Sequence, residues 1–127
     1  MREPPYDYSD RVIGLAIEVH RALGPGLLES VYEECLCFEL QANGIRFRRQ
    51  APLPVVYKSV RLDCGFRVDL IVEDILIVEL KTVERILPVH EAQLLTYLRL
   101  SGLMSGLILI FYVPVMKDGI KRMVRSP

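Results

Sequence analysis

The sequence predicts an α/β (α+β) fold, a mixed β-sheet flanked by helices. Three observations predict it. The first third of the chain carries apolar residues at helical spacing, and the pattern then becomes period two or continuously apolar up to residue 80. A further helical segment and a last apolar strand follow. The composition, 51% hydrophobic and 25% charged, is that of a globular chain, and the length predicts one domain over residues 1–127.

Two helices are expected first. Ser9 or Asp10 can cap the first helix, which Gly24-Pro25-Gly26 ends. The second helix is expected from about residue 27 to Asn43-Gly44, a pair that suits a left-handed stop. Both helices carry apolar side chains on one stripe, so each is expected to pack on the sheet.

The strands come next. Ile45–Gln50 and Leu53–Tyr57 are short and interrupted by prolines, which predict an edge strand or a bent connection. Arg61–Cys64 either continues the sheet or re-enters it. The two strongest strands are Phe66–Val72 and Ile75–Leu80. 

The last third of the chain is expected to hold one more helix and one more strand. The helix covers about Val89–Leu100, and Leu107–Phe111 reads as a buried strand. Lys117–Val124 is a weakly specified tail. The complete order is helix, helix, several strands, helix, strand.

The charge balance and the cysteine content limit which binding partners and which cellular compartment are expected. The 16 basic and 16 acidic residues balance, so any contact with nucleic acid has to come from local patches. An odd count of three cysteines argues against a disulfide framework and predicts a reducing compartment, the cytoplasm. The polar, proline-bearing N-terminus does not resemble a signal peptide. No apolar stretch approaches the roughly 20 residues needed to span a bilayer, so no membrane contact is expected.

Two basic patches are candidates for such contacts. Four of their residues, which charge alone singles out as candidate contacts to a nucleic-acid backbone, are Arg48, Arg49, Lys121 and Arg122. A solvated surface explains both patches equally well.

Three charged residues lie inside the most apolar strands: Asp69, Glu79 and Lys81. Charged side chains are rarely buried unless they are paired or bind a metal. A two-residue turn would place Asp69 and Glu79 on opposite faces of the sheet. A three-residue loop centred on Asp74, or one bulge, pairs them directly, with their Cβ atoms roughly 4.5–5.5 Å apart.

We therefore expect such a loop or bulge. Two carboxylates this close repel unless a cation lies between them, and hard divalent ions prefer such oxygen clusters. The alternative is a surface hairpin with cross-strand charge pairs, because Asp…Glu-x-Lys alone is a weak signal.

Other candidates lie on the helices. Gln93 and Tyr97 are four residues apart and share a helix face, where ordinary core packing is the alternative to a role in binding. Glu29 and Tyr32 share a face of the second helix, and Glu29 alternatively serves only the helix dipole. His20 is expected to be a dipole partner near the end of the first helix rather than a metal ligand.

Several motifs, in order, resemble the small bacterial GxxExxY protein family over about residues 10–124. They are Glu18-Val-His-Arg-Ala-Leu-Gly-Pro-Gly, Gly26-Leu-Leu-Glu29-Ser-Val-Tyr32, Arg67-Val-Asp69-Leu-Ile-Val, Val78-Glu79-Leu-Lys81 and Lys117-Asp-Gly-Ile-Lys-Arg122. That family is assigned to the PD-(D/E)xK nuclease superfamily. The resemblance implies a restriction-endonuclease-like core of helix, three strands, helix and strand, with an extra N-terminal helix.

The resemblance also implies a metal-dependent nuclease. Asp69 and Glu79, with Glu29 and the Leu80 carbonyl, would hold one or two Mg²⁺ or Mn²⁺ ions. Lys81 would be the motif lysine. Gln93 and Tyr97 resemble a QxxxY motif, with Gln93 catalytic and with Tyr97, Tyr32 and His20 in support.

A catalytically silent module on the same fold, binding a protein or nucleic acid, is the alternative function. Whether the nucleic acid is DNA or RNA stays open. A homodimer is expected, because so small a domain offers limited grip on a duplex.

Overall fold

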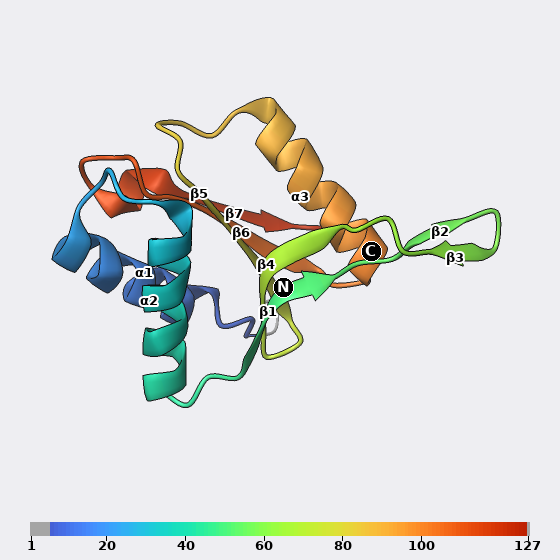
Figure 1. Ribbon diagram of the computed structural model, residues 1–127, viewed down its shortest axis with the longest axis horizontal. Coiled ribbons are helices and arrows are strands. Elements are labelled where there is room, and N and C mark those ends of the chain that lie inside the picture. The colour runs from blue at the N-terminus through green and yellow to red at the C-terminus, as the bar shows by residue number, and fades with distance from the viewer. Residues whose placement is uncertain (1–5, 127) are drawn as a thin grey trace, which may run out of the picture.

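The computed structural model describes residues 6–126, and Figure 1 shows helices packed on a central sheet. The helices are α1 (Ser9–Leu23), α2 (Glu29–Ala42), α3 (Pro88–Ser101) and a short 3₁₀ helix, η1 (Met116–Gly119). The strands are β1 (Phe47–Pro52), β2 (Val55–Tyr57), β3 (Val60–Leu62), β4 (Arg67–Val72), β5 (Leu76–Lys81), β6 (Ser105–Ile110) and β7 (Ile120–Val124). The predicted α/β class is confirmed.

Five strands form the central sheet in the order β1-β4-β5-β6-β7. The β5–β6 pair is parallel, because α3 carries the chain back between these strands, and the other pairs are antiparallel. The sheet is therefore mixed, as expected, and β1 is the edge strand that the prolines predicted. The strands β2 and β3 form a separate two-stranded sheet.

Helices α1 and α3 lie on opposite faces of the central sheet. Adjacent residues of a strand point to opposite faces, and on β7 Lys121 pairs with Glu91 of α3 whereas Arg122 pairs with Asp10 of α1. The sheet meets α3 closely at Gly106, where a Cβ atom would lie 2.8 Å from Leu94 Cδ1. Side chains buried between these layers form one core, which includes Leu36, Leu70, Val78, Leu94 and Leu107.

The ends of the first two helices follow different rules. Neither Ser9 nor Asp10 caps α1, because Ser9 is already helical and the N-cap is Tyr8. The Asp7 carboxylate instead accepts hydrogen bonds from the Ser9 N–H and hydroxyl. The predicted left-handed stop of α2 is confirmed at Gly44, whose φ is 70°. Its N–H donates to Gln41 O, and the next N–H donates to Leu40 O, which closes the helix.

Two expectations about strands were wrong. The segment expected as Leu53–Tyr57 contributes only Val55–Tyr57, which pairs with Val60–Leu62 as a hairpin outside the central sheet. The expected tail after Lys117 contains β7, an edge strand paired with β6. Only Ile120 and Met123 of β7 pack against the core, so the strand lacks the regular apolar alternation that would have revealed it.

Candidate active site

The turn between β4 and β5 sets the register of the acidic residues. Val72 pairs with Leu76 and Leu70 pairs with Val78, so the loop has three residues and is centred on Asp74. Glu73 and Asp74 both adopt left-handed backbone conformations there. The predicted three-residue loop is therefore confirmed, and its register, continued by one pair, places Asp69 opposite Glu79.

At that pair the two carboxylates replace the backbone ladder. The Asp69 N–H donates to Glu79 Oε2 at 2.9 Å, and the Leu80 N–H donates to Asp69 Oδ2 at 2.8 Å. Regular pairing of β4 with β5 ends at Leu70 and Val78. Each acidic side chain therefore satisfies a backbone N–H of the opposite strand, and the two carboxylates lie side by side.

Glu79 is the more buried of the two acids, with 6% of its surface exposed. Burial raises the pKa of the Glu79 carboxyl to about 9, and the negative charge of Asp69 adds to the shift. Lys81 opposes it only weakly. At neutral pH this carboxyl holds a proton unless another positive charge binds beside it.

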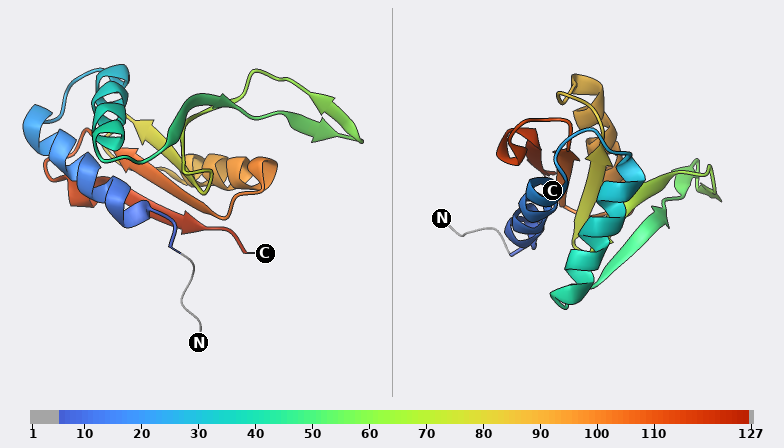
Figure 2. Two further views of the ribbon diagram at one scale, coloured as in Figure 1. Left: turned by 90° about the horizontal axis from the view of Figure 1, so that it is seen from below. Right: turned by 60° about the vertical axis from the view of Figure 1, so that its left-hand side comes forward.

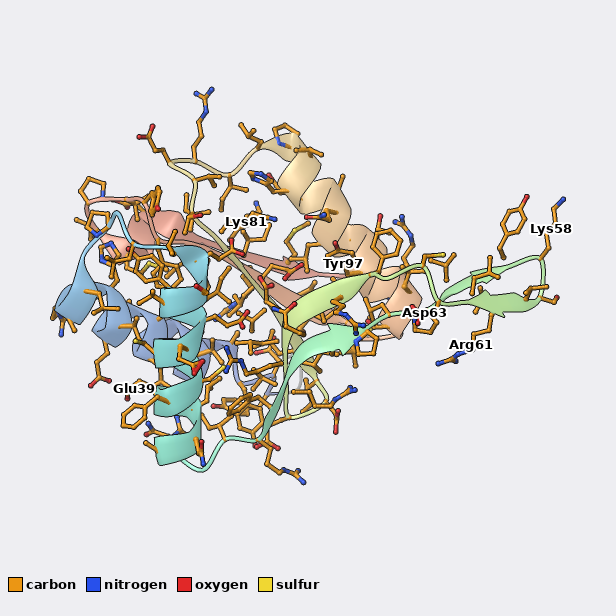
Figure 3. All side chains as sticks on the ribbon, in the orientation of Figure 1. Glu39, Lys58, Arg61, Asp63, Lys81 and Tyr97 are labelled. Atoms are coloured by element: carbon orange, nitrogen blue, oxygen red, sulfur yellow. The ribbon has the colours of Figure 1, made fainter. Side chains whose placement is uncertain are left out.

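Lys81, Gln93 and Tyr97 surround the acidic pair on the α3 face. Lys81 follows Glu79 by two residues on β5, so both point to that face. Lys81 Nζ donates to Gln93 Oε1 of α3 at 3.2 Å. Burial raises the pKa of the Tyr97 hydroxyl, and so do the charges of Glu79 and Asp69, which places this ring near both acids. Figure 3 shows Lys81 and Tyr97 between the sheet and α3.

Glu29 is the first residue of α2. Partial burial raises the pKa of its carboxyl, the charge of Asp69 raises it further, and the charge of Lys81 lowers it. Glu29 is therefore within electrostatic reach of Asp69 and Lys81.

Tyr32 explains how the loop before Glu29 is held. The Tyr32 hydroxyl donates to Gly24 O at 2.6 Å and accepts from the Leu27 N–H at 3.1 Å. Its ring is fully buried and stacks on Phe111 with centroids 4.3 Å apart. Tyr32 thus fastens the loop from which α2 and Glu29 start.

Sequence reasoning missed Gln50, which contacts the site from β1. Its Nε2 donates to Asp69 Oδ1 at 3.3 Å and to Glu33 Oε1 at 2.9 Å. Gln50 has a φ of 48°, a left-handed conformation that is strained for a non-glycine residue inside a strand. Only the β1–β4 register, in which Gln50 lies across from Asp69, could have suggested it.

The four basic residues singled out as nucleic-acid contacts all form ion pairs. Arg49 binds Glu33 and Glu34 of α2, which extends the Gln50 network. Arg48 binds Asp74 at 3.1 Å, and the β7 pair binds acids of α3 and α1, as described above. Since β1 and β7 are opposite edges of the sheet, these residues do not form one surface.

His20 lies away from the acidic pair. It is buried on α1, and its Nε2 is 2.8 Å from the Val113 carbonyl oxygen, to which it donates. His20 therefore ties α1 to the segment after β6 instead of bonding to the carbonyl groups of its own helix.

The side chains at the site fit an oxygen-seeking divalent cation in kind. Asp69 and Glu79 supply adjacent carboxylates, and Glu29 is within electrostatic reach of Asp69. Within residues 6–126 no three Asp, Glu, His or Cys side chains converge as a finished metal cage.

The fold and the acid, acid and lysine arrangement define a nuclease-like class of protein. The helix α2, the strands β1, β4 and β5, the helix α3 and the strand β6 give the expected restriction-endonuclease-like order, with α1 as the extra N-terminal helix. The model of the PD-(D/E)XK nuclease superfamily matches residues 6–123, and the chain belongs to that superfamily.

Members of this superfamily are nucleases, which act on nucleic acid and generally use divalent metals. No curated protein and no solved structure matches the chain. None of the helices in residues 6–126 is long and apolar enough to cross a membrane.

Proposed function

We propose that the protein is a metal-dependent nuclease that hydrolyses phosphodiester bonds in nucleic acid. The observation that carries this proposal is the cross-strand pair of Asp69 and Glu79, with the buried Glu79 next to Lys81. A carboxyl whose pKa is raised to about 9 needs a positive group beside it in order to be charged at neutral pH. A divalent cation meets that need, and Lys81 alone does not.

Asp69 and Glu79 would hold the ion, together with Glu29 and the Leu80 carbonyl. A bound Mg²⁺ or Mn²⁺ supplies Lewis-acid stabilisation of negative charge on a phosphate and acidifies water. Lys81 would orient the attacking water and offset charge on the phosphate. Gln93, which accepts a hydrogen bond from Lys81, would hold that ammonium group in place or contact the substrate, and Tyr97 would support it.

We further assign the chain to the GxxExxY group within the superfamily. Its signature residues Gly26, Glu29 and Tyr32 have distinct physical roles. Gly26 has a φ of 106°, Tyr32 fastens the loop, and Glu29 faces the charges of the site. The motif therefore builds the loop that delivers one acid to the catalytic pair. A homodimer remains the assembly that we expect.

A catalytically silent binding module is the second candidate. Two observations favour it: Asp69 and Glu79 already accept backbone hydrogen bonds, and no ready-made three-ligand cage exists within residues 6–126. On this alternative the carboxylates only hold β4 against β5.

Incubation of labelled single- and double-stranded DNA and RNA with Mn²⁺, Mg²⁺ or EDTA separates the two candidates. We expect cleavage with metal, none with EDTA, and none by the folded variants Asp69→Ala, Glu79→Ala and Lys81→Ala. Asp118→Ala is the matched control, because Asp118 is exposed on η1. No cleavage by the folded wild-type protein, or cleavage that survives loss of the pair, would support the silent module.

A further inference from the structure

The β2–β3 hairpin projects from the body of the protein. Both views in Figure 2 show it extending beyond the central sheet, and no strand of that sheet pairs with it. It is inserted between β1 and β4, so its base lies close to Gln50 and Asp69. The Leu53 N–H donates to Phe66 O at 2.9 Å and closes this base.

One face of the hairpin is apolar and faces solvent. Cross-strand pairing joins Val55 to Leu62 and Tyr57 to Val60, which places these four side chains on one face. Tyr57 is 59% exposed and Val60 is 54% exposed. An isolated two-stranded hairpin is only marginally stable in water. An apolar face displayed in this way therefore suits a binding partner.

The charges around the hairpin indicate the kind of partner. Among the described residues, no acid pairs with Lys58, Arg61 or Arg67, whereas the four basic residues of β1 and β7 discussed above each form an ion pair. Asp63 is the one acid between residues 53 and 68, and its carboxylate accepts from the Gly65 N–H. Figure 3 shows Lys58 at the far end of the hairpin and Arg61 on its side. This excess of unpaired cations suits a polyanion.

These cations lead toward the acidic pair. Arg67 is two residues from Asp69 on β4, so both side chains lie on the same face of that strand. A phosphate chain that passes Asp69 therefore meets Arg67 and then the hairpin.

The shape of the hairpin indicates a duplex. The major groove of B-form DNA is about 12 Å wide and admits a two-stranded β-ribbon, whereas the major groove of duplex RNA is too deep and narrow to be read. The turn at Lys58-Ser59 is tight, with φ values of 49° and 67°, so the ribbon ends in two residues.

We propose that the β2–β3 hairpin is a DNA-binding arm that enters the major groove of a duplex beside the active site. Lys58 and Arg61 contact phosphates, and the apolar face with Tyr57 contacts base edges and sugars. The five residue-to-residue steps from Leu53 to Lys58 span roughly 17 Å at about 3.3 Å per residue, which corresponds to about five base pairs. This inference rests on the proposed nuclease function, because it takes the substrate to be nucleic acid.

Fluorescence anisotropy with labelled duplex DNA in EDTA tests the arm without cleavage. We expect the double variant Lys58→Ala/Arg61→Ala to bind more than about tenfold more weakly at about 0.1 M salt. The slope of log K against log salt, which is negative, should become less steep by about 1.8. Tyr57→Ser should weaken binding without changing that slope. The matched control is Arg11→Ala/Arg21→Ala, which removes two exposed cations from α1.

Three results would overturn the arm. The first is equal affinity and equal salt slope for the hairpin variant and the α1 control. The second is a wild-type protein that does not bind duplex DNA. The third is a Tyr57→Ser variant that turns a dimer into a monomer in light scattering and keeps its DNA affinity, which would make the hairpin a contact between copies.

Cleavage assays on the same proteins separate this inference from the proposed function. Wild-type protein that binds duplex DNA through the hairpin but cleaves nothing with Mn²⁺ would refute the nuclease and support the arm. Wild-type protein that cleaves while the hairpin variants bind and cleave equally well would refute the arm alone.

Discussion

Two glutamates of the β4–β5 hairpin, Glu73 in its loop and Glu79 on β5, show how position decides what a carboxylate does. Each accepts a hydrogen bond from a backbone N–H of a neighbouring strand or loop. Arg46 binds Glu73 through its backbone and its guanidinium, and these contacts lower the pKa of the Glu73 carboxyl. Burial and Asp69 raise the pKa of Glu79.

The contrast separates a structural acid from a candidate catalytic one. Glu73 has its cation within the chain, so its charge is already compensated. Glu79 faces another acid, so a bound cation would be needed to balance its negative charge. A site for a divalent ion is expected where the chain gathers like charges without supplying enough of the opposite one.

Glu79→Gln should produce the largest effect. The amide keeps the size and one acceptor of the carboxylate but removes its charge, so we expect cleavage to fall by at least about 100-fold while the protein stays folded. Steady-state cleavage and circular dichroism measure the two consequences. Full activity in a folded Glu79→Gln variant would remove Glu79 from the site.

Substitution of Gln50 should give the next largest effect. Gln50→Ala removes the contact to Asp69, and we expect about 10- to 100-fold less activity, the usual range for residues that orient a metal ligand. Gln50→Gly loses the same contact but relaxes the left-handed backbone, so it should be more stable than the alanine variant by about 1 kcal/mol.

The metal dependence of Gln50 variants shows whether Gln50 acts through Asp69. Gln50→Glu should shift the Mn²⁺ concentration needed for half-maximal activity, because it adds a charge beside Asp69. Identical metal dependence in every Gln50 variant would reduce its role to folding.

The pH dependence of stability should differ between the two glutamates. A carboxyl whose folded pKa is raised stabilises the fold fully below its unfolded pKa, near 4.5, and that contribution is lost as the pH rises toward about 9. In EDTA, wild-type protein should therefore lose stability across this window, and Glu79→Gln should lose less. Denaturant unfolding at several pH values checks this, and parallel curves for both proteins would contradict the raised pKa.

Glu73→Gln should have the smallest effect. Its lowered pKa means that its stabilising contribution is present above its unfolded pKa and is lost as the pH falls. We therefore expect a small loss of stability at neutral pH, which vanishes in acid, and cleavage within about twofold of wild type. Cleavage that falls as far as in Glu79→Gln would abolish the contrast between the two acids.

Much of the fold could be predicted from the spacing of apolar residues and from the glycines, prolines and turn residues that end helices and strands. The left-handed stop at Gly44, the edge strand near Pro52 and the loop centred on Asp74 all follow from local rules. The strand β7 was not predicted, because an edge strand needs few buried side chains. Its place is decided by pairing with β6, which the local sequence of residues 120–124 does not reveal.

The site was only partly readable for a similar reason. Asp69, Glu79 and Lys81 stood out as charges in apolar strands, and the loop length then fixed the carboxylate pair. Gln50 gave no such signal, because a glutamine near a proline in an edge strand is unremarkable. Its contact with Asp69 depends on a left-handed backbone that only the tertiary structure imposes.

Calorimetric titration of the protein with Mn²⁺ at pH 7, in two buffers of different ionisation enthalpy, tests the central claim most directly. A cation that binds between Asp69 and Glu79 must displace the proton held on Glu79. We predict millimolar or tighter binding with release of about one proton, and no binding by Asp69→Ala. Absence of binding to wild-type protein, or equal binding to both proteins, would contradict the metal site.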